Sequence, residues 1–434
     1  MGRRSAYTPL RVYLNNRMVG RLSRESNGAI SFAYDEEWLA WPYALPVSLS
    51  LPLRETAYRG QSVTTVLENL LPDSDRQRRV VAETVGARGV DAYSLLSQIG
   101  HDCVGALQFI VGDEDAPDST GTLEGEAIDA TAVEKILNGL SQAPLGLARD
   151  DAFRISVAGA QEKTALLWHD GRWVKPHGAT PTTHLIKTQI GELPGGLDLS
   201  NSVENEFYCL KLMQAFGLPV NQATIETFGN TRALVIERFD RRWTKDARLL
   251  RLPQEDCCQA LSVPPTLKYQ NEGGPGMTQV LDLLAGSDTP QVDQENFLKS
   301  QIIFWLMGAT DGHAKNFSVH LSPGGSYRMT PLYDVVTAQP ALNNRQIERK
   351  HMKMAMSVGN NNHYRFDEIR GRHFVQTAKD TGISNKRAQA IVDAVVEVAP
   401  DALVSASTHL PNDFSDSVVD TVEDAVMHRL EKLK

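Results

Sequence analysis

Cysteine is scarce in this chain of 434 residues, and its four cysteines form no CxxC pair. They are too few for a disulfide framework, which predicts a protein of a reducing compartment. Long hydrophobic runs are also lacking: the most apolar stretch, residues 302–309, is far shorter than the roughly 20 residues of a membrane span. No apolar segment follows the charged start of the chain, so we expect no signal peptide and a cytoplasmic location.

A surplus of basic residues is absent as well. The sequence has 44 Lys and Arg against 53 Asp and Glu, which gives a formal net charge of −9. Because proteins that bind nucleic acid on their own usually carry a positive surplus, we expect DNA binding without a partner to be weak. Hydrophobic residues make up 41% of the chain, as in ordinary globular proteins, and its length predicts about two or three domains.

The first part of the chain, residues 1–145, is predicted to be a β-rich module. Asn15 and Asn16 are a hairpin signal between two apolar runs, and residues 62–71 and 73–85 have the pattern of short helices. Residues 104–111 are predicted to be a buried strand. The acidic segment 113–130 is poor in large apolar residues, which predicts an exposed loop or linker.

Two further parts follow. Residues 150–240 are predicted to form a small strand-rich lobe with one amphipathic helix at 201–216, and Ile155 and Val157 suggest a strand around Ser156. Residues 241–434 are predicted to be mainly helical, with helices at 277–284, 294–308, 374–381, 385–398 and 416–434. The expected fold class is α+β: a β-rich module, a small lobe and a helical lobe.

The most informative segment is residues 309–317, Ala-Thr-Asp-Gly-His-Ala-Lys-Asn-Phe. Asp311 and Asn316 have the D-x-x-x-x-N spacing of kinase catalytic loops. There the Asp accepts the proton of the substrate hydroxyl and the Asn holds Mg²⁺. Asp334 follows an apolar, strand-like run and is a candidate for a second magnesium ligand. The same spacing also occurs in ordinary loops with Asx turns and helix caps.

Three further features favour the kinase interpretation. Lys187 lies in a predicted strand, where kinases place the lysine that pairs with the nucleotide phosphates. An acidic helix follows, and either Glu204 or Glu206 is a candidate partner of this lysine; the sequence does not choose between them. The apolar run 233–240 ends in a polar segment, like the hinge that binds adenine between the two lobes of a kinase.

Long motifs along nearly the whole chain resemble those of the HipA family of serine/threonine kinase toxins. They are ENLLPDS, FRISVAGAQEKTALL, ERFDRRW, LPQED, GATDGHAKNFS and PLYDVV. The resemblance implies a two-lobed, kinase-like fold with an N-terminal β-rich module, and transfer of the γ-phosphoryl group of ATP, with Mg²⁺, to a protein serine or threonine. It also implies a HipB-type helix–turn–helix antitoxin, operator DNA bound through that complex, and growth arrest (persistence) through phosphorylation of glutamyl-tRNA synthetase.

The resemblance further implies roles for single residues. Asp311 would be the catalytic base, Asn316 and Asp334 would hold Mg²⁺, Ser156 would be autophosphorylated, and Lys379 would contact DNA within the antitoxin complex. The residues expected to bind ATP are Val157, Ala158, Gly159, Ala160, Gln161, Glu162, Lys163, Lys187, Glu237, Arg238, Phe239, His313, Lys315, Asn316, Tyr333 and Asp334.

Some residues depart from the pattern of ordinary kinases or have a second interpretation. There is no GxGxxG motif, and Gly159 stands alone between two alanines, so phosphate binding by its loop rests on the resemblance. His313 fits a loop-stabilising hydrogen bond or a contact with phosphate or substrate. Lys315 either stabilises the transferred phosphoryl group or is solvated. The acidic segment 254–256 is typical of a solvated loop, with a nucleotide or metal role as its alternative.

Three interpretations at a larger scale stay open. The cluster of Arg238, Arg241, Arg242 and Trp243 is interpreted as a set of inter-lobe salt bridges in preference to a nucleic-acid site. A small-molecule kinase on a related fold would use the same Asp311, Asn316 and Asp334. A catalytically dead scaffold that binds a repressor and DNA would not need this complete set of residues.

Overall fold

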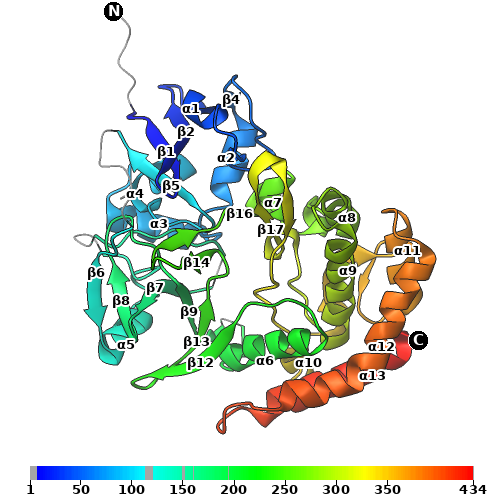
Figure 1. Cartoon of the computed structure of the whole chain (residues 1–434). Helices are drawn as coiled ribbons and strands as arrows, with labels where there is room; N and C mark the ends of the chain where they lie inside the picture. Colours follow the sequence, from blue (N-terminus) through cyan, green and yellow to red (C-terminus); the bar gives the residue numbers. More distant parts are fainter. Residues whose placement is uncertain (1–6, 113–120, 149–151, 160, 194, 434) are drawn as a thin grey trace, which may run out of the picture.

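The computed structural model describes residues 7–112, 121–148, 152–159, 161–193 and 195–433 of the chain. Its elements follow the predicted order: a β-rich N-terminal part, a second sheet with a helix packed on it, and a mainly helical C-terminal part (Figure 1). The two large antiparallel sheets lie in the first two parts and the longest helices in the third, as expected for the predicted α+β class. None of the described helices is both long and apolar enough to cross a membrane.

The N-terminal part is built on an antiparallel sheet. Its elements are β1 Leu10–Leu14, β2 Arg17–Arg24, β3 Ile30–Tyr34, α1 Glu36–Leu39, β4 Tyr58–Arg59, α2 Gln61–Glu68, α3 Asp75–Val85, α4 Ala92–Ile99 and β5 Leu107–Val111. The strand order is β4-β3-β2-β1-β5. Asn15 and Asn16 close the predicted hairpin between β1 and β2, and Asn15 adopts the left-handed conformation that asparagine tolerates.

The middle of the chain forms a second antiparallel sheet. Its elements are β6 Gly125–Ile128, α5 Ala130–Asn138, β7 Lys163–His169, β8 Arg172–Pro176, β9 His184–Thr188, β10 Gly191–Leu193, β11 Leu197–Leu199, α6 Ser202–Ala215, β12 Ala223–Phe228 and β13 Thr231–Glu237. The order is β12-β13-β9-β7-β8-β6, with β10 and β11 as a separate hairpin. The prediction of a linker at 113–130 was wrong in part, because β6 pairs with β8 as an edge strand; residues 113–120 lie outside the described residues.

Helix α6 packs between β12 and β13 of this sheet and the helices of the C-terminal part (Figure 1). The predicted amphipathic pattern was wrong, because the helix is buried on nearly all sides, including Glu204, Asn205 and Glu206. Buried polar groups require partners. Asn205 finds them in Thr337, since it accepts a hydrogen bond from the Thr337 N–H and donates one to its carbonyl, both at 2.9 Å. The helix thus presents charged side chains from a fixed position.

The C-terminal part is mainly helical. Its helices are α7 Cys257–Ala260, α8 Met277–Ala285, α9 Pro290–Met307, α10 Gln339–Asn343, α11 Gly371–Lys379, α12 Asn385–Ser407 and α13 Asp416–Leu433, and its strands are β14 Arg241–Trp243, β15 Leu249–Arg251, β16 Gln254–Asp256, β17 Ser318–Leu321, β18 Tyr327–Met329, β19 Lys353–Val358 and β20 His363–Arg365. Helix α12 was predicted to end at residue 398 but continues through Pro400. Ala399, Ala402 and Leu403 remain buried beyond that point, and their packing outweighs the lost backbone hydrogen bond.

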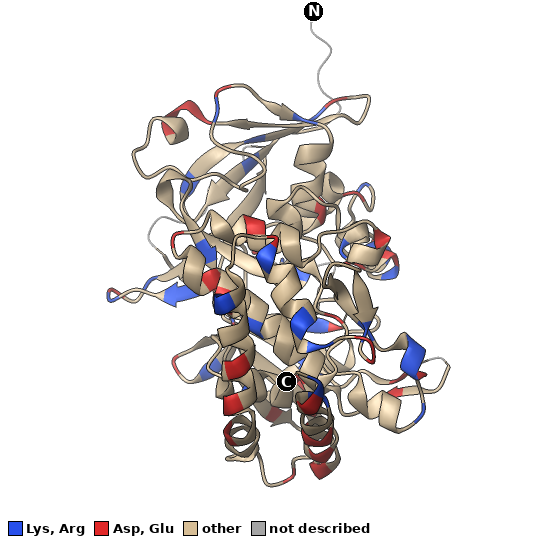
Figure 2. Cartoon of the chain, turned by 90° about the vertical axis from the view of Figure 1, so that its right-hand side faces the viewer, with Lys and Arg blue, Asp and Glu red and all other residues tan. Residues whose placement is uncertain are grey.

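Charges of both signs are spread over the face shown in Figure 2, and acidic residues gather on the helices at its lower end. This view shows no continuous basic face, in agreement with the net charge of −9. Lys379 is exposed in the last turn of α11. Its predicted contact with DNA stays a prediction.

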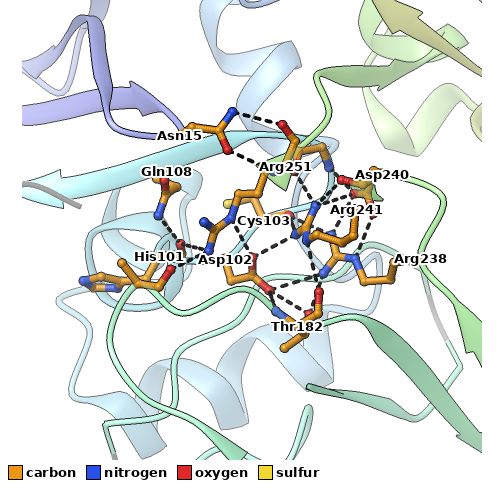
Figure 3. Close-up of polar contacts among 12 residues, drawn as sticks. Asn15, His101, Asp102, Cys103, Gln108, Thr182, Arg238, Asp240, Arg241 and Arg251 are labelled. Atoms are coloured by element: carbon orange, nitrogen blue, oxygen red, sulfur yellow. Dashed lines mark hydrogen bonds and ion pairs between the residues drawn. The ribbon is translucent and has the colours of Figure 1, made fainter. Parts of the chain in front are cut away.

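A buried cluster of charges joins the N-terminal part to the rest of the molecule (Figure 3). Asp102, which follows α4, accepts hydrogen bonds from Arg241 at 2.8 Å and from Arg251 at 2.9 Å through Oδ1. Its Oδ2 accepts from the Thr182 hydroxyl at 2.7 Å and from Arg238 at 3.3 Å. Burial would raise the pKa of Asp102, but the three arginines hold it well below its usual range. We call this set, with Asp240, the Asp102 cluster.

The Asp102 cluster tests the predicted salt bridges. Arg238 also pairs with Asp240 at 2.8 Å, and Arg241 pairs with it at 3.1 Å. Arg238 and Arg241 therefore form salt bridges, as predicted, but their partners are the neighbouring Asp240 and Asp102 of the N-terminal part, so the bridges join the N-terminal part to the lobes instead of one lobe to the other. Arg242 and Trp243 are exposed instead.

Candidate active site

A cavity of about 870 Å³ is lined by side chains from all three parts of the chain. Its volume is in the range of small-molecule and cofactor sites. The predicted site residues that line it are Val157, Ala158, Gly159, Gln161, Glu162, Lys163, Lys187, Arg238, Phe239, Asp311, His313, Lys315, Asn316, Tyr333 and Asp334. Glu237 is exposed at the end of β13 and is not among the lining residues. Ala160 lies outside the described residues.

Ser156 directly precedes the predicted phosphate-binding loop, residues 157–163, and the strand predicted around Ser156 was wrong because the backbone there is irregular. Ser156 is fully buried; its hydroxyl donates to the Leu70 carbonyl at 2.8 Å and its N–H to the Asp102 carbonyl at 3.0 Å. Bonds to the N-terminal part thus replace a sheet ladder. Gly159 has a φ of +103°, and a Cβ there would lie 2.5 Å from Lys163 Nζ. Only glycine fits this conformation so close to a buried ammonium group.

Two lysines lie side by side beneath this loop, because Lys163 of β7 pairs in register with Lys187 of β9. Lys187 Nζ lies 2.8 and 2.9 Å from the two oxygens of Glu206 and 2.6 Å from Asp334 Oδ1. Burial would lower the pKa of Lys187, but Asp334 and Glu206 outweigh it and raise that pKa. Burial and the neighbouring Lys187 lower the pKa of Lys163 to about 8. The cavity therefore contains a lysine that stays charged beside one that titrates readily.

The structure also chooses between the two candidate partners of Lys187. Glu206 forms the ion pair, whereas Glu204 lies 2.6 Å from Arg232 Nε and accepts a hydrogen bond from Gln189 at 2.7 Å. The two carboxylates are two positions apart on α6, so they point in different directions.

Asp311 and Asn316 lie in the loop that follows α9. This helix is buried on nearly all sides and ends at Gly308 in a left-handed conformation. Asn316 donates from Nδ2 to the Asp311 carbonyl at 2.8 Å, which fixes the two predicted residues relative to each other. The side chain of Asp311 is 51% exposed, whereas Asn316 is buried. An accessible carboxylate on a rigid loop is what a general base for a hydroxyl acceptor requires.

Tyr269 and His313 flank the carboxylate of Asp311. The Tyr269 hydroxyl donates a hydrogen bond to Asp311 Oδ1, and its ring meets His313 edge-on with the ring centroids 4.9 Å apart. His313 Nε2 lies 3.8 Å from the same oxygen, too far for a hydrogen bond. Burial lowers the pKa of His313, so the ring is neutral near pH 7. Both interpretations of His313 stay predictions.

Lys315 is buried, so the interpretation of a solvated lysine was wrong. Its Nζ lies 2.7 Å from Asp73 Oδ1, and Asp73 Oδ2 lies 2.8 Å from Lys268 Nζ. Burial would raise the pKa of Asp73, but the two lysines lower it to about 2. Asp73 belongs to the ENLLPDS motif, whose residues have no role predicted from the sequence. The N-terminal part therefore places a carboxylate in the cavity.

The predicted adenine hinge follows β13. The N–H groups of Glu237 and Arg238 donate to backbone carbonyls at 2.9 and 2.8 Å, and no partner is recorded for the Phe239 N–H within the part of the chain that the structure describes. The guanidinium of Arg238 belongs to the Asp102 cluster (Figure 3). The ring of Phe239 packs against Tyr333 with the centroids 5.6 Å apart. Of these three residues, Phe239 is the one with a free backbone donor for a ligand.

Asn316 and Asp334 offer oxygen atoms to the cavity. The prediction that Asp334 follows a strand was wrong. The residue lies in irregular backbone and takes a left-handed conformation with φ 57°. Burial would raise the pKa of Asp334, but Lys187 and Lys163 hold it well below its usual range, so the carboxylate is ionised. No group of three or more potential metal-binding side chains occurs among the described residues. One carboxylate and one amide oxygen still fit Mg²⁺, which takes its remaining ligands from water and phosphate.

The acidic segment 254–256 is not solvated, contrary to expectation, because Glu255 and Asp256 are buried. Burial raises the pKa of Glu255 to about 8 and that of Asp256 to about 7. Glu255 accepts a hydrogen bond from the Leu49 N–H at 2.7 Å, and Asp256 caps α7. Asp256 lines the cavity, whereas Glu255 ties the N-terminal part to the C-terminal part.

Comparison with known families matches two segments of this chain. Residues 155–403 match the model of the HipA-like C-terminal domain, and residues 10–110 match that of the HipA N-terminal domain. The first of these covers more than half of the chain and includes every residue predicted at the site.

Comparison with individual proteins gives relatives along nearly the whole chain. A putative kinase of Sinorhizobium fredii, Y4mE, is 33% identical over 94% of this chain and 96% of its own length. The serine/threonine-protein kinase toxin HipA of Shewanella oneidensis is 28% identical over 76% of this chain and 75% of its own.

A solved structure confirms the predicted fold. A chain in the Shewanella oneidensis complex of HipA, HipB and operator DNA superposes with a TM-score of 0.80, at 23% identity, over 98% of this chain and 97% of that one. The protein therefore has the two-lobed, kinase-like fold of that neighbour, with the N-terminal β-rich module included.

Proposed function

The chain belongs to the HipA family, and on that premise we propose that it is a serine/threonine protein kinase that uses ATP and Mg²⁺. The observation that carries this proposal is the meeting of Lys187, Asp311, Asn316 and Asp334 in one cavity. These residues come from segments far apart in the sequence. A loop with the D-x-x-x-x-N spacing and a buried lysine meet in one cavity, as they do when both serve one reaction.

ATP would bind with its adenine at the hinge and its phosphates beneath the loop of residues 157–163. The free N–H of Phe239 suits a ring nitrogen of adenine, and Lys163 and Lys187 suit the phosphates. Mg²⁺, held by Asn316 and Asp334, would neutralise charge on the β- and γ-phosphates.

Phosphoryl transfer would then run through Asp311. Its carboxylate accepts the proton of a serine or threonine hydroxyl, whose oxygen forms a bond to the γ-phosphorus. The bond from that phosphorus to the bridging oxygen breaks, ADP leaves with the electron pair, and Asp311 returns its proton to solvent. Lys315, in the same loop as Asp311, and Lys268 line the same cavity, where they would stabilise the charge of the transferred group.

Ser156 is the proposed site of autophosphorylation, and its burial gives the modification a physical consequence. The hydroxyl is 0% exposed and bonded to the N-terminal part, so a phosphate with nearly two negative charges has no room there. The loop must leave its place, and ATP loses its cover. We expect Ser156→Asp to bind ATP poorly and Ser156→Ala to bind it normally in calorimetric titration. A phosphorylated structure with the loop still closed would refute this mechanism.

The biological role follows the family proposal. We propose a toxin of a type II toxin–antitoxin pair, with a HipB-type antitoxin, operator DNA bound through that complex near Lys379, and glutamyl-tRNA synthetase as the protein substrate. The division into residues 1–145, 150–240 and 241–434 is proposed as the domain organisation.

The proposed activity is tested with ATP labelled at the γ-phosphate. The wild-type chain and Asp311→Asn are incubated with it, Mg²⁺, and casein as a generic acceptor. Label on serine or threonine of protein, lost in the variant, supports the proposal. Label found only on small molecules when metabolites are added would favour a small-molecule kinase, and no label at all would refute both.

A further inference from the structure

Asp73 touches both of the loops on which the proposed kinase function depends. Its N–H donates to the Gly159 carbonyl at 3.3 Å, and its carboxylate meets Lys315 at 2.7 Å and Lys268 at 2.8 Å. Gly159 belongs to the loop over the proposed phosphate site, and Lys315 lies between Asp311 and Asn316. One residue from outside the two lobes therefore holds both sides of the cavity.

The segment that carries Asp73 is firmly anchored. Asn69 donates to the Val263 carbonyl at 3.0 Å, and Arg78 donates to the Pro72 carbonyl at 2.6 Å and pairs with Glu68. The side chain of Asp73 is only 13% exposed. A carboxylate held this way has one position, so it can define the positions of flexible lysine side chains.

The charges of this group suit a phosphoryl group. Two ammonium groups share one carboxylate, which leaves one net positive charge beside the catalytic loop. Each lysine has three N–H donors, so donors remain for phosphate oxygens after each has bonded to Asp73. Without Asp73, two long side chains would be repelled by each other and would lose their common direction.

We propose that Asp73 is a positioning residue of the phosphoryl-transfer site, which holds Lys315 and Lys268 where the transferred group gains negative charge. This inference rests on the proposed kinase function and deepens it, because it makes the N-terminal part a component of the catalytic site.

The test measures conversion of Mg·ATP to ADP in a Ser156→Ala background, where water takes the place of the acceptor and self-modification does not interfere. We expect Asp73→Asn to lower kcat by at least about tenfold, as misplaced catalytic groups do, while the affinity for ATP stays within about twofold. The matched control is Asp75→Asn, because Asp75 is exposed two positions further along the same segment. It should match the parent in both quantities.

A double-mutant cycle separates positioning from a structural role. If Asp73 acts through Lys315 and Lys268, adding Asp73→Asn to the double variant Lys315→Gln/Lys268→Gln should cause no further loss of activity. Additive losses, an equal fall in kcat and ATP affinity, or a kcat within about twofold of the parent would each overturn the inference. A parent that converts no more ATP than Asp311→Asn would refute the proposed function and this inference with it. Thermal melting of each variant identifies any that fails to fold, in which case Lys268→Gln, on the exposed side of the pair, must show the kcat loss.

Discussion

The Asp102 cluster and the cavity around Lys187 and Asp334 are both buried groups of charge, yet their charges are bonded in different ways. In the Asp102 cluster the carboxylate is 1% exposed, and both of its oxygens are taken by arginine and threonine donors. In the cavity the side chains of Asp334 and Asp311 are 33% and 51% exposed. The first group is saturated by the protein, and the second keeps acceptor atoms open to a ligand.

This difference shows that burial and ion pairing do not mark a functional site by themselves. In the sequence, Arg238 and Arg241 also fit a nucleic-acid site, but every arginine donor that faces Asp102 is already used inside the protein (Figure 3). The cavity residues differ because some of their acceptor atoms face the cavity and remain available to a ligand. The comparison predicts that variants of the Asp102 cluster lose stability and that variants of the cavity residues lose phosphoryl transfer or ATP binding.

The largest expected effect is on stability, in Asp102→Asn. Removal of one charge leaves three buried arginines without their shared carboxylate, and breaking a buried pair costs about 3–5 kcal/mol. Chemical denaturation should show that loss in the free energy of unfolding. The matched control is Asp246→Asn, since Asp246 pairs with Arg248 on the surface at 2.7 Å and should leave stability unchanged. Equal effects of the two changes would break the comparison.

Asp311→Asn should lower activity and leave stability unchanged. Asparagine keeps the size of the side chain but accepts no proton, so phosphoryl transfer should fall by roughly 100-fold or more. Because the side chain is half-exposed, the melting temperature should stay the same. Full autophosphorylation by the purified variant would mean that Asp311 is not the base.

Asp334→Ala should weaken Mg-dependent binding of ATP by about tenfold or more, and Asp311→Asn should not, because Asp334 would hold the Mg²⁺ that neutralises phosphate charge, whereas the base meets only the acceptor. Lys187 keeps Glu206 as a partner, so the loss of stability should be smaller than in Asp102→Asn. Calorimetric titration of both variants with Mg·ATP decides the point. Equal affinities would remove Asp334 from the proposed metal site.

The last comparison concerns the pH dependence of stability, through Glu255. Burial raises its pKa from 4.5 to about 8, so the folded protein holds a proton that the unfolded chain releases between these values. The stabilisation is complete below the lower value and is lost as pH rises through the higher one. The melting temperature of the wild type should therefore fall below that of Glu255→Gln as pH rises from 5 to 8. Parallel curves would show that Glu255 is ionised in the folded state.

Much of the cavity could be predicted from the sequence because its residues lie in long motifs. Asp311 and Asn316 are close in the chain, and the strand position of Lys187 follows from local pattern. The choice between Glu204 and Glu206 could not be predicted, because it depends on how α6 is rotated against the sheet.

The residues that were missed are those brought in by distant segments. The role of Asp73 was missed because it lies 242 positions from Lys315, a residue that was predicted to bind ATP, and no periodicity relates the two. Lys268 and Tyr269 lie in a loop without regular pattern. The buried position of Glu255 was also hidden, because an acidic segment is solvated unless a neighbouring domain covers it, and that domain lies some two hundred positions earlier in the chain.

The central claim is that the residues of the cavity around Lys187 and Asp334 transfer phosphoryl groups. The most direct test is the intact mass of the purified chain after incubation with Mg·ATP. The account predicts that the wild type gains the mass of one phosphate, which maps to Ser156, and that Asp311→Asn gains none. A wild-type chain that binds Mg·ATP without gaining phosphate, or an Asp311→Asn chain that gains as much as the wild type, would contradict it.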